Sequence, residues 1–279
     1  MLEIPESTRL SDQLMETVNG KTIKNVIANQ SPHKFAWFSG DPDEYRNLLS
    51  GKSVTGSAAY GGMAELRIES YKMVFCDGTN VRFLQPGAPL PQKHQLLMEF
   101  DDLSVIFCSV QMYGGMLLMD INAEEGYYKS SKHRLNPLDQ AFDEAYFTLL
   151  MDEVKPSLSI KAFLATQQRI PGLGNGVLQD ILFNAKVHPR RKLESLTESQ
   201  RHAVFQSVKQ TILEMTQKGG RDTEKDLYGR PGGYQTKLSS NTKGKPCPVC
   251  GDSICREAYL GGNIYYCPTC QKFDRETMA

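Results

Sequence analysis

Two Cys-x-x-Cys pairs near the C-terminal end constrain the fold of this chain most. Cys247 and Cys250 form the first pair and Cys267 and Cys270 form the second, with 16 residues between the pairs. Two tight turns at this spacing can present four thiolates to one zinc ion in a tetrahedral arrangement. Disulfide bonds are disfavoured because nothing in the sequence indicates secretion. We therefore predict a structural zinc site.

The residues between the two pairs favour a β-hairpin. Residues 254–259 and 263–266 are strand-like runs on either side of a Leu-Gly-Gly segment at 260–262, which is typical of a zinc ribbon. The other three cysteines fall outside this spacing, and we expect them to be ordinary buried thiols: Cys76, Cys108 and Cys255.

The composition is that of an ordinary folded protein. Hydrophobic residues make up 40% of the 279 residues and charged residues 23%, with 32 basic and 32 acidic side chains, which excludes a disordered, collagen-like or coiled-coil chain. The length accommodates two or three modules with cores of their own. No run approaches the roughly 20 apolar residues of a membrane helix, and the first residues lack the layout of a secretory signal. We expect a cytoplasmic protein that does not contact membranes.

Two features in the middle of the chain suit a phosphate group. Residues 155–192 carry seven basic side chains against Asp180 alone, whereas residues 1–150 have a net charge of −6, and a polyanion responds to such a local field. Residues 169–177 (RIPGLGNGV) predict a compact turn before a helix that begins at Asn175 or one residue later. Backbone N–H groups at a helix start bind phosphate oxygens. A solvated helix face and a plain turn are the alternative interpretations.

The first half of the chain is predicted to be rich in β-strands. Residues 1–135 alternate short apolar runs with turn signals, as in a β-sandwich or barrel. A helix precedes them, and Ser7 is its expected cap. Trp37, the single tryptophan, lies in an apolar run and is expected in the core. The expected strands cover residues 22–28, 34–38, 64–69, 72–75, 81–84, 94–100, 105–110 and 115–120.

The second half is predicted to be helical. From about residue 143 to residue 218 the apolar spacing changes to 3.6 residues, which predicts a helical bundle. The stretch that follows is rich in glycine, serine and charge and is interpreted as a loop. The predicted fold class is therefore α+β, with a helix and β-sandwich in residues 1–135, a helical module with its loop in residues 136–242, and the four-cysteine ribbon in residues 243–279.

With these parts in this order, the chain resembles the formamidopyrimidine-DNA glycosylase and endonuclease VIII family. The resemblance implies a helix-two-turn-helix domain that contains the Gly-Asn turn, a zinc finger formed by the ribbon, and an enzyme that removes oxidised bases from DNA and usually cuts the backbone. The resemblance covers essentially the whole chain, and the matching motifs are Glu-Ile-Pro-Glu at 3–6, Gln-Lys-His at 92–94, Leu-Ser-Ile-Lys at 158–161, Pro-Gly-Leu-Gly-Asn at 171–175, Val-His-Pro at 187–189, Gly-Gly at 219–220 and Lys-Pro-Cys at 245–247.

The chain departs from the family where functional groups are expected. The family's nucleophile is the amine of an N-terminal proline, which forms a Schiff base with the sugar. The matching residue here is Leu2, and we expect Met1 to be retained before so large a residue. The family's lysine matches Gly62 and its zinc-finger arginine matches Gly262. These losses predict that the lyase step is absent. The residues that fill the gap left by a flipped base match Asp77, Gln111 or Met112, and Tyr113, and Tyr113 can still act as a wedge.

Other positions keep the family's residue types. Glu3 and Glu6 match the two acidic residues beside the nucleophile and are the candidate catalytic residues. Capping of the first helix is the alternative role for these two carboxylates. Gly174 and Asn175 match the phosphate-contacting turn, and Lys161 matches the basic residue upstream of it. A helix cap is the alternative role for Asn175.

The loop over residues 221–234 matches the family's segment that covers the extruded base. Arg230, Tyr234 and Tyr228 are candidates to stack on a base or hydrogen-bond to it. The alternative is a flexible surface loop. His188 is interpreted as a packing residue.

Two functional classes follow from this pattern. In the first, the protein is a monofunctional DNA glycosylase in which Glu3 or Glu6 assists the attack of water. In the second, it is a non-catalytic module that recognises damaged or structured DNA, and RNA binding through the same surface is a third possibility. The expected partner is damaged or distorted double-stranded DNA, bound by a monomer in the cytoplasm, at the nucleoid if the source is a bacterium.

Overall fold

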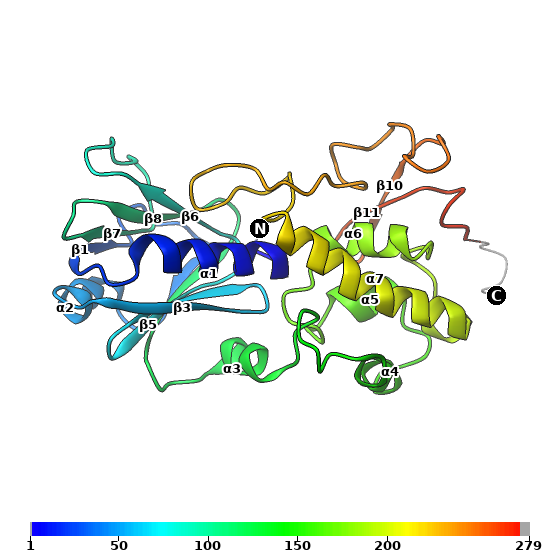
Figure 1. The fold of residues 1–279 in the computed structure, drawn as a ribbon, viewed down its shortest axis with the longest axis horizontal. Helices are drawn as coiled ribbons and strands as arrows, with labels where there is room; N and C mark the ends of the chain where they lie inside the picture. Colours follow the sequence, from blue (N-terminus) through cyan, green and yellow to red (C-terminus); the bar gives the residue numbers. More distant parts are fainter. Residues whose placement is uncertain (1, 274–279) are drawn as a thin grey trace. The chain divides into compact units, whose positions relative to one another are not determined.

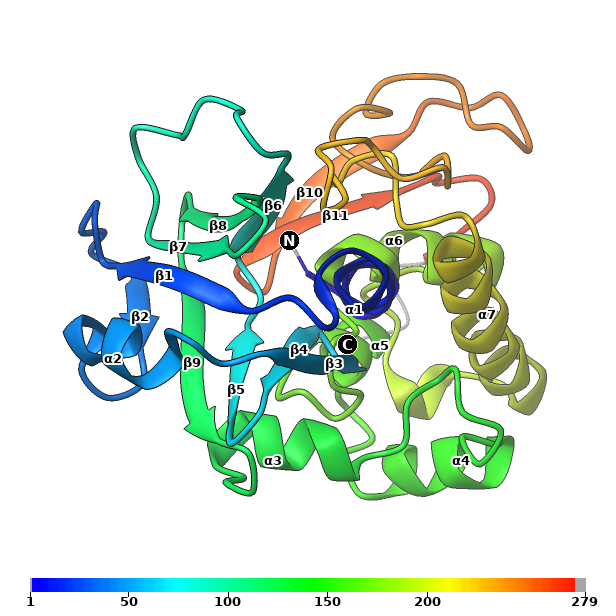
Figure 2. The same cartoon turned by 60° about the vertical axis from the view of Figure 1, so that its left-hand side comes forward.

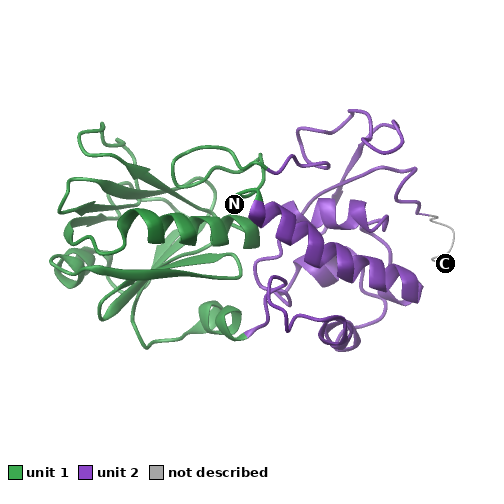
Figure 3. Ribbon diagram, in the orientation of Figure 1, with its two compact units in different colours: residues 1–133, 218–233 green, residues 134–217, 234–279 purple. Residues whose placement is uncertain are grey.

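The computed structural model describes residues 2–273, and the chain divides into two compact units (Figure 3). Unit 1 contains residues 1–133 and 218–233, and unit 2 contains residues 134–217 and 234–279. The ribbon therefore belongs with the helices, and segment 218–233 belongs with the β-rich part, which differs from the three expected modules. The predicted retention of Met1 falls outside the described residues. No helix between residues 2 and 273 is long and apolar enough to cross a membrane.

Unit 1 is built on two β-sheets, which confirms the predicted sandwich. The first sheet is antiparallel and the second is mixed, because β2 runs parallel to β9. In spatial order, the first contains β1 (Ile23–Ala28), β7 (Leu96–Phe100), β8 (Val105–Val110) and β6 (Thr79–Leu84), and the second contains β2 (Ala36–Phe38), β9 (Gly114–Asp120), β5 (Tyr71–Phe75), β4 (Met63–Ile68) and β3 (Val54–Tyr60).

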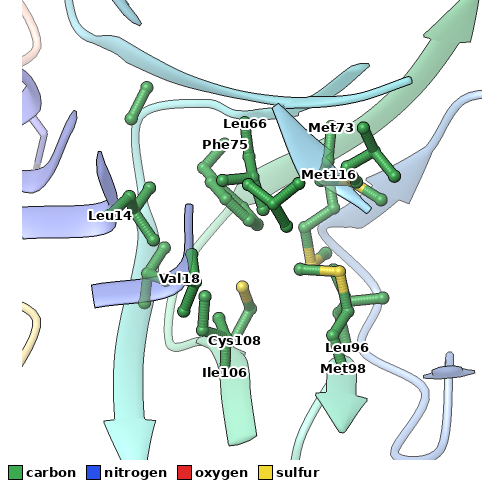
Figure 4. Close-up of a cluster of buried hydrophobic side chains, with 14 of the residues drawn as sticks. Leu14, Val18, Leu66, Met73, Phe75, Leu96, Met98, Ile106, Cys108 and Met116 are labelled. Carbon is green, nitrogen blue, oxygen red and sulfur yellow. The ribbon is translucent and has the colours of Figure 1, made fainter. Parts of the chain in front are cut away.

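Both sheets contribute to one hydrophobic core, which also includes the helix α1 (Ile4–Val18) (Figure 4). Successive side chains of a strand point to opposite faces, so alternate residues of each strand reach this core. Met73 and Phe75 come from the mixed sheet and Met98 and Ile106 from the antiparallel sheet. Leu14 lies among them because α1 runs alongside β3 and β4 (Figure 2).

Two local expectations about unit 1 are wrong. Ser7 does not cap α1, because the helix already begins at Ile4 and the Ser7 hydroxyl donates a hydrogen bond to Gly61 O at 2.6 Å. Trp37 is not in the core, since 47% of it is exposed. Its strand is only three residues long and lies at the edge of the mixed sheet. Unit 1 also contains η1 (Pro42–Glu44), α2 (Tyr45–Leu49) and α3 (Gly126–His133).

Unit 2 combines helices with a two-stranded hairpin (Figure 1), as predicted. The turn at Leu260 and Gly261 has φ angles of 49° and 73°, as a two-residue hairpin turn requires. α6 packs against α7 and also contacts β11. The elements are α4 (Glu144–Asp152), α5 (Ile160–Ala165), α6 (Asn175–Asn184), η2 (Leu193–Ser195), α7 (Glu198–Gln217), β10 (Cys255–Tyr259) and β11 (Gly262–Tyr266).

Candidate functional site

Two carboxylates at the start of α1 and one guanidinium from segment 218–233 form a buried ionic cluster in unit 1. Arg221 donates to Glu6 Oε1 from its backbone N at 3.1 Å and from Nε at 2.9 Å, and its Nη2 donates to Glu6 Oε2 at 2.8 Å. Arg221 Nη1 lies 3.5 Å from Glu3 Oε1. The exposed fractions are 2% for Glu3, 8% for Glu6 and 3% for Arg221. The structure thus brings both candidate catalytic carboxylates together, around an arginine that motif comparison does not identify.

The electrostatics of this cluster hold it together. Burial alone disfavours the charged guanidinium, but the charges of Glu3 and Glu6 outweigh it and raise the pKa of Arg221. Removing one partner of a buried ion pair costs about 3–5 kcal/mol, because the remaining charge is left unpaired. Glu6 Oε2 also accepts a hydrogen bond from Glu3 N at 3.3 Å, which is the capping role considered for this carboxylate. Glu6 therefore has a clear structural function.

Within unit 1, glycines and polar contacts fix segment 218–233 to residues 1–133. Gly220 has a φ of 97°, and a Cβ atom on Gly232 would lie 2.2 Å from Gly220 O, so both positions require glycine. Gln13 of α1 donates to Asp226 Oδ2 at 2.8 Å and accepts from Leu227 N at 3.0 Å. Leu227 is fully buried in the core. These contacts argue against the alternative of a flexible surface loop.

A pocket in unit 1 adjoins the ionic cluster. Leu2 is half-buried, packs against the core and forms part of the pocket lining. Arg82 and Glu224 line the same pocket, and burial lowers the pKa of Arg82. A lining of guanidinium and carboxylate groups beside an apolar side chain can hydrogen-bond the polar edge of a planar ring.

Tyr113, the candidate wedge, directly precedes β9 and is held by the partly buried carboxyl group of Asp77. Its hydroxyl donates to Asp77 Oδ2 at 3.0 Å. Burial raises the pKa of Asp77, and burial together with the Asp77 charge raises the pKa of Tyr113 to about 12. Met112 is 71% exposed beside it. Gly62, which matches the family's lysine, is buried and carries no amine.

In unit 2, side chains of α5 and α6 contact the hairpin. α6 begins at Asn175, as predicted, and Asn175 Nδ2 donates to Asn263 O at 2.9 Å. Lys161 Nζ donates to Tyr259 O, and the residue is only 3% exposed. Burial lowers the pKa of Lys161. Both candidate DNA-binding side chains therefore contact the hairpin backbone in this structure.

Gly262 lies at the same place, where the resemblance expects an arginine. A Cβ atom on Gly262 would lie 3.7 Å from Lys161 Nζ and from Asn175 Nδ2. The hairpin is also held by Gln179 of α6, whose Oε1 accepts a hydrogen bond from Tyr265 N at 2.9 Å. Motif comparison does not identify Gln179, and no local pattern distinguishes it from other helical glutamines.

The surface of the hairpin is open and has a basic neighbour. Residues 258–263 line a shallow depression. The guanidinium of Arg190 lies 4.2 Å from the centre of the Tyr259 ring and is paired with Glu257 at 3.1 Å. A depression with an arginine and a buried lysine at its edge is suited to a phosphate group.

The three candidates from the predicted base-covering loop have different environments. Tyr234 is 2% exposed and lies in unit 2, where Asp180 is its polar neighbour. The expectation that Tyr234 stacks on a base is wrong for this structure, because its ring is part of the interior. Arg230 is exposed in unit 1, with its guanidinium 5.6 Å from the centre of the Tyr228 ring, so it remains accessible to a ligand.

The four cysteines of the ribbon form a cluster that fits a structural zinc ion. Their sulfur atoms all lie within 4.8 Å of one another, with 3.8 Å between Cys247 and Cys270 and 3.4 Å between Cys250 and Cys267. Tetrahedral zinc with sulfur ligands requires about 3.8 Å between sulfurs. Gln271 joins the cluster to the helical part, since it accepts from Cys267 N and donates to Val187 O, both at 3.0 Å.

His188 is a packing residue, as interpreted from the sequence. It is 3% exposed, and its ring lies parallel to that of Phe273 with 4.4 Å between the ring centres. It therefore contributes to the interior of unit 2 beside the ribbon.

Comparisons with known proteins agree with this arrangement. Residues 135–226 match the formamidopyrimidine-DNA glycosylase H2TH domain. Proteins named formamidopyrimidine-DNA glycosylase from Listeria innocua and Bacillus cereus are 28% and 26% identical to this chain, over 98% and 97% of it and over 100% and 99% of their own lengths.

Solved structures of a Lactococcus lactis relative share the fold. Its complex with DNA that contains an abasic site superimposes with a TM-score of 0.84 at 23% identity, and its complex with DNA that contains an oxidised pyrimidine superimposes with a TM-score of 0.83 at 23% identity. In both cases 97% of this chain and 100% of the other chain are covered. The sequence motifs, the two-sheet unit, the helical domain and the four-cysteine ribbon all agree with these matches: residues 135–226 match the family's H2TH domain, and the chain is similar to formamidopyrimidine-DNA glycosylases along nearly its whole length.

Proposed function

We propose that this protein binds double-stranded DNA at a damaged position and removes the base by hydrolysis, without a Schiff-base step. The relatives' names and the DNA in the related structures support the substrate class. The observation that carries the proposal is the ionic cluster of Glu3, Glu6 and Arg221 beside a pocket lined in part by Leu2. We further propose that the protein acts as a monomer in the cytoplasm.

The proposed loss of the lyase step rests on two positions. Leu2 occupies the position of the family's nucleophilic proline, and it packs against the core of unit 1. Gly62 occupies the position of the family's lysine and has no side chain. A Schiff base needs an amine within reach of the sugar. Gly62 supplies none, and with Met1 retained before Leu2 the terminal amine of the chain lies one residue before the position of the family's proline.

The two carboxylates have different roles in this proposal. Glu6 accepts three hydrogen bonds from Arg221, so it holds segment 218–233 in place. Glu3 lies on the other side of the same guanidinium, with 3.5 Å between its Oε1 and Arg221 Nη1. We assign Glu3 to the reaction, where a carboxylate can orient water or stabilise the positive charge that develops on the sugar.

The proposed DNA contacts lie on both units. In unit 2, Gly174, Asn175 and Lys161 supply the helix start and the ammonium group for a phosphate, beside the depression formed by the hairpin. In unit 1, Tyr113 is the proposed wedge and Arg230 is the exposed cation of the loop. The zinc ion has a structural role, because its cluster fixes the hairpin.

A non-catalytic recognition module is the second candidate function. It is favoured by the pairing of Arg221 with both carboxylates, because an ion-paired carboxylate is a weaker base than an unpaired one. In this alternative the pocket still binds an altered base and the cluster only maintains its shape.

A single-turnover assay distinguishes the two candidates. Duplexes with oxidised, alkylated or abasic positions, and matching single strands of DNA and RNA, are incubated with the protein and then treated with hot alkali, which breaks the backbone wherever a base has been lost. We expect breaks that appear only after alkali and no covalent adduct on borohydride trapping. Glu3→Gln is expected to abolish the breaks, whereas Glu16→Gln, an exposed carboxylate on the same helix, is expected to have no effect.

The other outcomes are equally informative. Breaks without alkali, or a borohydride adduct on an abasic duplex, would show that a lyase step is retained. Tight binding without any base loss would support the recognition module. Stronger binding to RNA than to any DNA would overturn the proposed substrate class.

A further inference from the structure

The exposed Trp37 and the partly buried Tyr113 have parallel aromatic rings in unit 1. Their ring centres are 6.4 Å apart and their planes differ by only 5°. Trp37 is 47% exposed, and Phe35, two residues earlier, is 52% exposed. Large aromatic side chains are usually covered by other parts of the protein, so two that are exposed only two residues apart indicate a binding surface.

The backbone holds both rings in place. β2 pairs with β9 so that Trp37 lies opposite Gly115, and a Cβ atom on Gly115 would lie 2.5 Å from Trp37 Nε1. Any side chain at position 115 would therefore displace the indole. On the other side, a Cβ atom on Gly78 would lie 1.8 Å from Tyr113 O, so the loop that carries Tyr113 approaches this turn as closely as glycine allows. The pair is thus positioned before any ligand arrives.

The charge around the rings suits a nucleic acid. Lys34 Nζ lies 5.3 Å from the centre of the Phe35 ring, and Lys34 is exposed. Proteins that bind unpaired strands combine flat aromatic rings, on which bases stack, with basic groups that contact the backbone. The two rings are stacked with parallel planes, and the outer aromatic face of such a stack is flat, so a planar nucleobase can cover it more completely than an irregular aliphatic side chain can.

We propose that Trp37 and Tyr113 form a single stacking platform for an unpaired nucleobase, and that Trp37 extends the surface offered by the wedge residue. This inference rests on the proposed function, because it assumes that the protein binds DNA. It assigns a ligand to Trp37, which the apolar run around it predicts to lie in the core. Lys34 contacts the phosphate backbone of the same strand.

The platform is testable because Trp37 is the only tryptophan in the chain. Stacking of a base on the indole quenches its fluorescence, so tryptophan emission reports directly on this site. The protein is titrated with a fully paired duplex, a duplex with an abasic position that leaves one base unpaired, and a single strand, and binding is followed independently by the anisotropy of a dye on the DNA. We expect strong quenching with the two ligands that contain unpaired bases and little quenching with the paired duplex at equal saturation.

Variants provide the second readout. Trp37→Leu is expected to weaken binding to the abasic duplex about tenfold or more while leaving the paired duplex unaffected. Trp37→Phe keeps a ring and is expected to restore most of the affinity. Leu90→Ala removes another exposed apolar side chain of unit 1, 57% exposed, and is expected to change nothing. Circular dichroism of each variant verifies that it is folded.

The results separate this inference from the proposed function. Normal DNA binding without quenching, and without an effect of Trp37→Leu, would overturn the platform and leave the proposed function intact. Failure of the unaltered protein to bind any of the three DNAs would overturn both. If DNA leaves the fluorescence unchanged and Trp37→Leu instead converts a dimer to a monomer in sedimentation, the surface binds a second copy of the chain.

Discussion

The starts of α1 and α6 are built in opposite ways. At α1 the polar groups are satisfied within the chain, since Glu6 receives three hydrogen bonds from the buried Arg221. At α6 the N-cap is Gly174, which has no side chain, and Asn175 Oδ1 is buried without a hydrogen-bond partner among residues 2–273. Both Glu6 and Asn175 match functional residues of the family, but the protein satisfies them to different extents. Glu6 is fully engaged by Arg221, whereas Asn175 keeps an oxygen that can still accept a hydrogen bond.

Removal of the zinc ion is expected to have the largest effect on folding, and this effect should be confined to unit 2, which contains α6 and the hairpin. Structural zinc contributes about 10–16 kcal/mol of apparent binding free energy to small domains. Chelation, or Cys250→Ser, should therefore unfold the hairpin and abolish DNA binding, while the Trp37 emission spectrum of unit 1 stays unchanged. Metal analysis and limited proteolysis follow the loss. A ribbon that resists proteolysis equally with and without metal would contradict the zinc assignment.

Arg221→Met tests the start of α1, where the carboxylates are paired within the chain. The variant leaves Glu3 and Glu6 buried without their cation, and we expect a loss of about 3–5 kcal/mol in the free energy of unfolding. Arg230→Met, an exposed arginine in the same segment, is the control and should change stability by less than about 0.5 kcal/mol. Denaturant unfolding measures both. Equal, small losses in the two variants would show that the cluster does not stabilise unit 1.

The double variant Lys161→Met with Asn175→Ala tests the start of α6, where hydrogen-bonding capacity remains. In the unaltered protein, we expect these side chains to leave the hairpin backbone and bind a DNA phosphate. The slope of log affinity against log salt should then be less steep by about one unit in the double variant. Lys155→Met, an exposed lysine of the same basic segment, is the control and should leave the slope unchanged. Binding measured over a series of salt concentrations decides the matter. An unaltered slope in the double variant would show that neither residue binds phosphate and that both only hold the hairpin in place.

Asp77→Asn should have the smallest effect and compares two kinds of carboxyl within unit 1. Asp77 is partly buried, and its side-chain hydrogen-bond partner is a tyrosine rather than an arginine. Burial raises the pKa of Asp77, so the folded protein binds this proton more tightly than the unfolded chain. Stability therefore falls as the pH rises from the unfolded value, about 3.9, through the folded pKa. The asparagine variant, which can still accept from Tyr113, should melt at a higher temperature than the unaltered protein at pH 8 and equally at low pH. A difference independent of pH would exclude this cause.

Much of the fold follows from local patterns in the sequence. The eight expected strands agree with β1, β2 and β4 to β9 within two residues at each end, because alternating apolar residues face a common core. β3 was not expected, since its sequence VTGSAAY consists mostly of small residues with few apolar side chains. It is a strand because it pairs with β4 and lies under α1.

The candidate site depends on contacts that local patterns do not contain. The zinc cluster was predictable because its four ligands lie in two short motifs. Arg221 was not, because it contacts Glu6 across 215 residues of sequence. Burial was misjudged in both directions, since the tertiary environment covers Tyr234 and leaves Trp37 exposed. Periodicity indicates which face of a long element is buried, but it says little about a three-residue edge strand or an irregular segment.

The interruption of unit 1 in the sequence has a consequence for how the chain is made. A ribosome completes residues 1–133 well before segment 218–233 exists, so α1 emerges while Glu3 and Glu6 have no guanidinium to pair with. Domains generally fold as units during synthesis, yet this one has to wait until α7, which ends at Gln217, has left the ribosome. The N-terminal unit, the first to be synthesised, is thus finished only after all the helices of unit 2 have been translated.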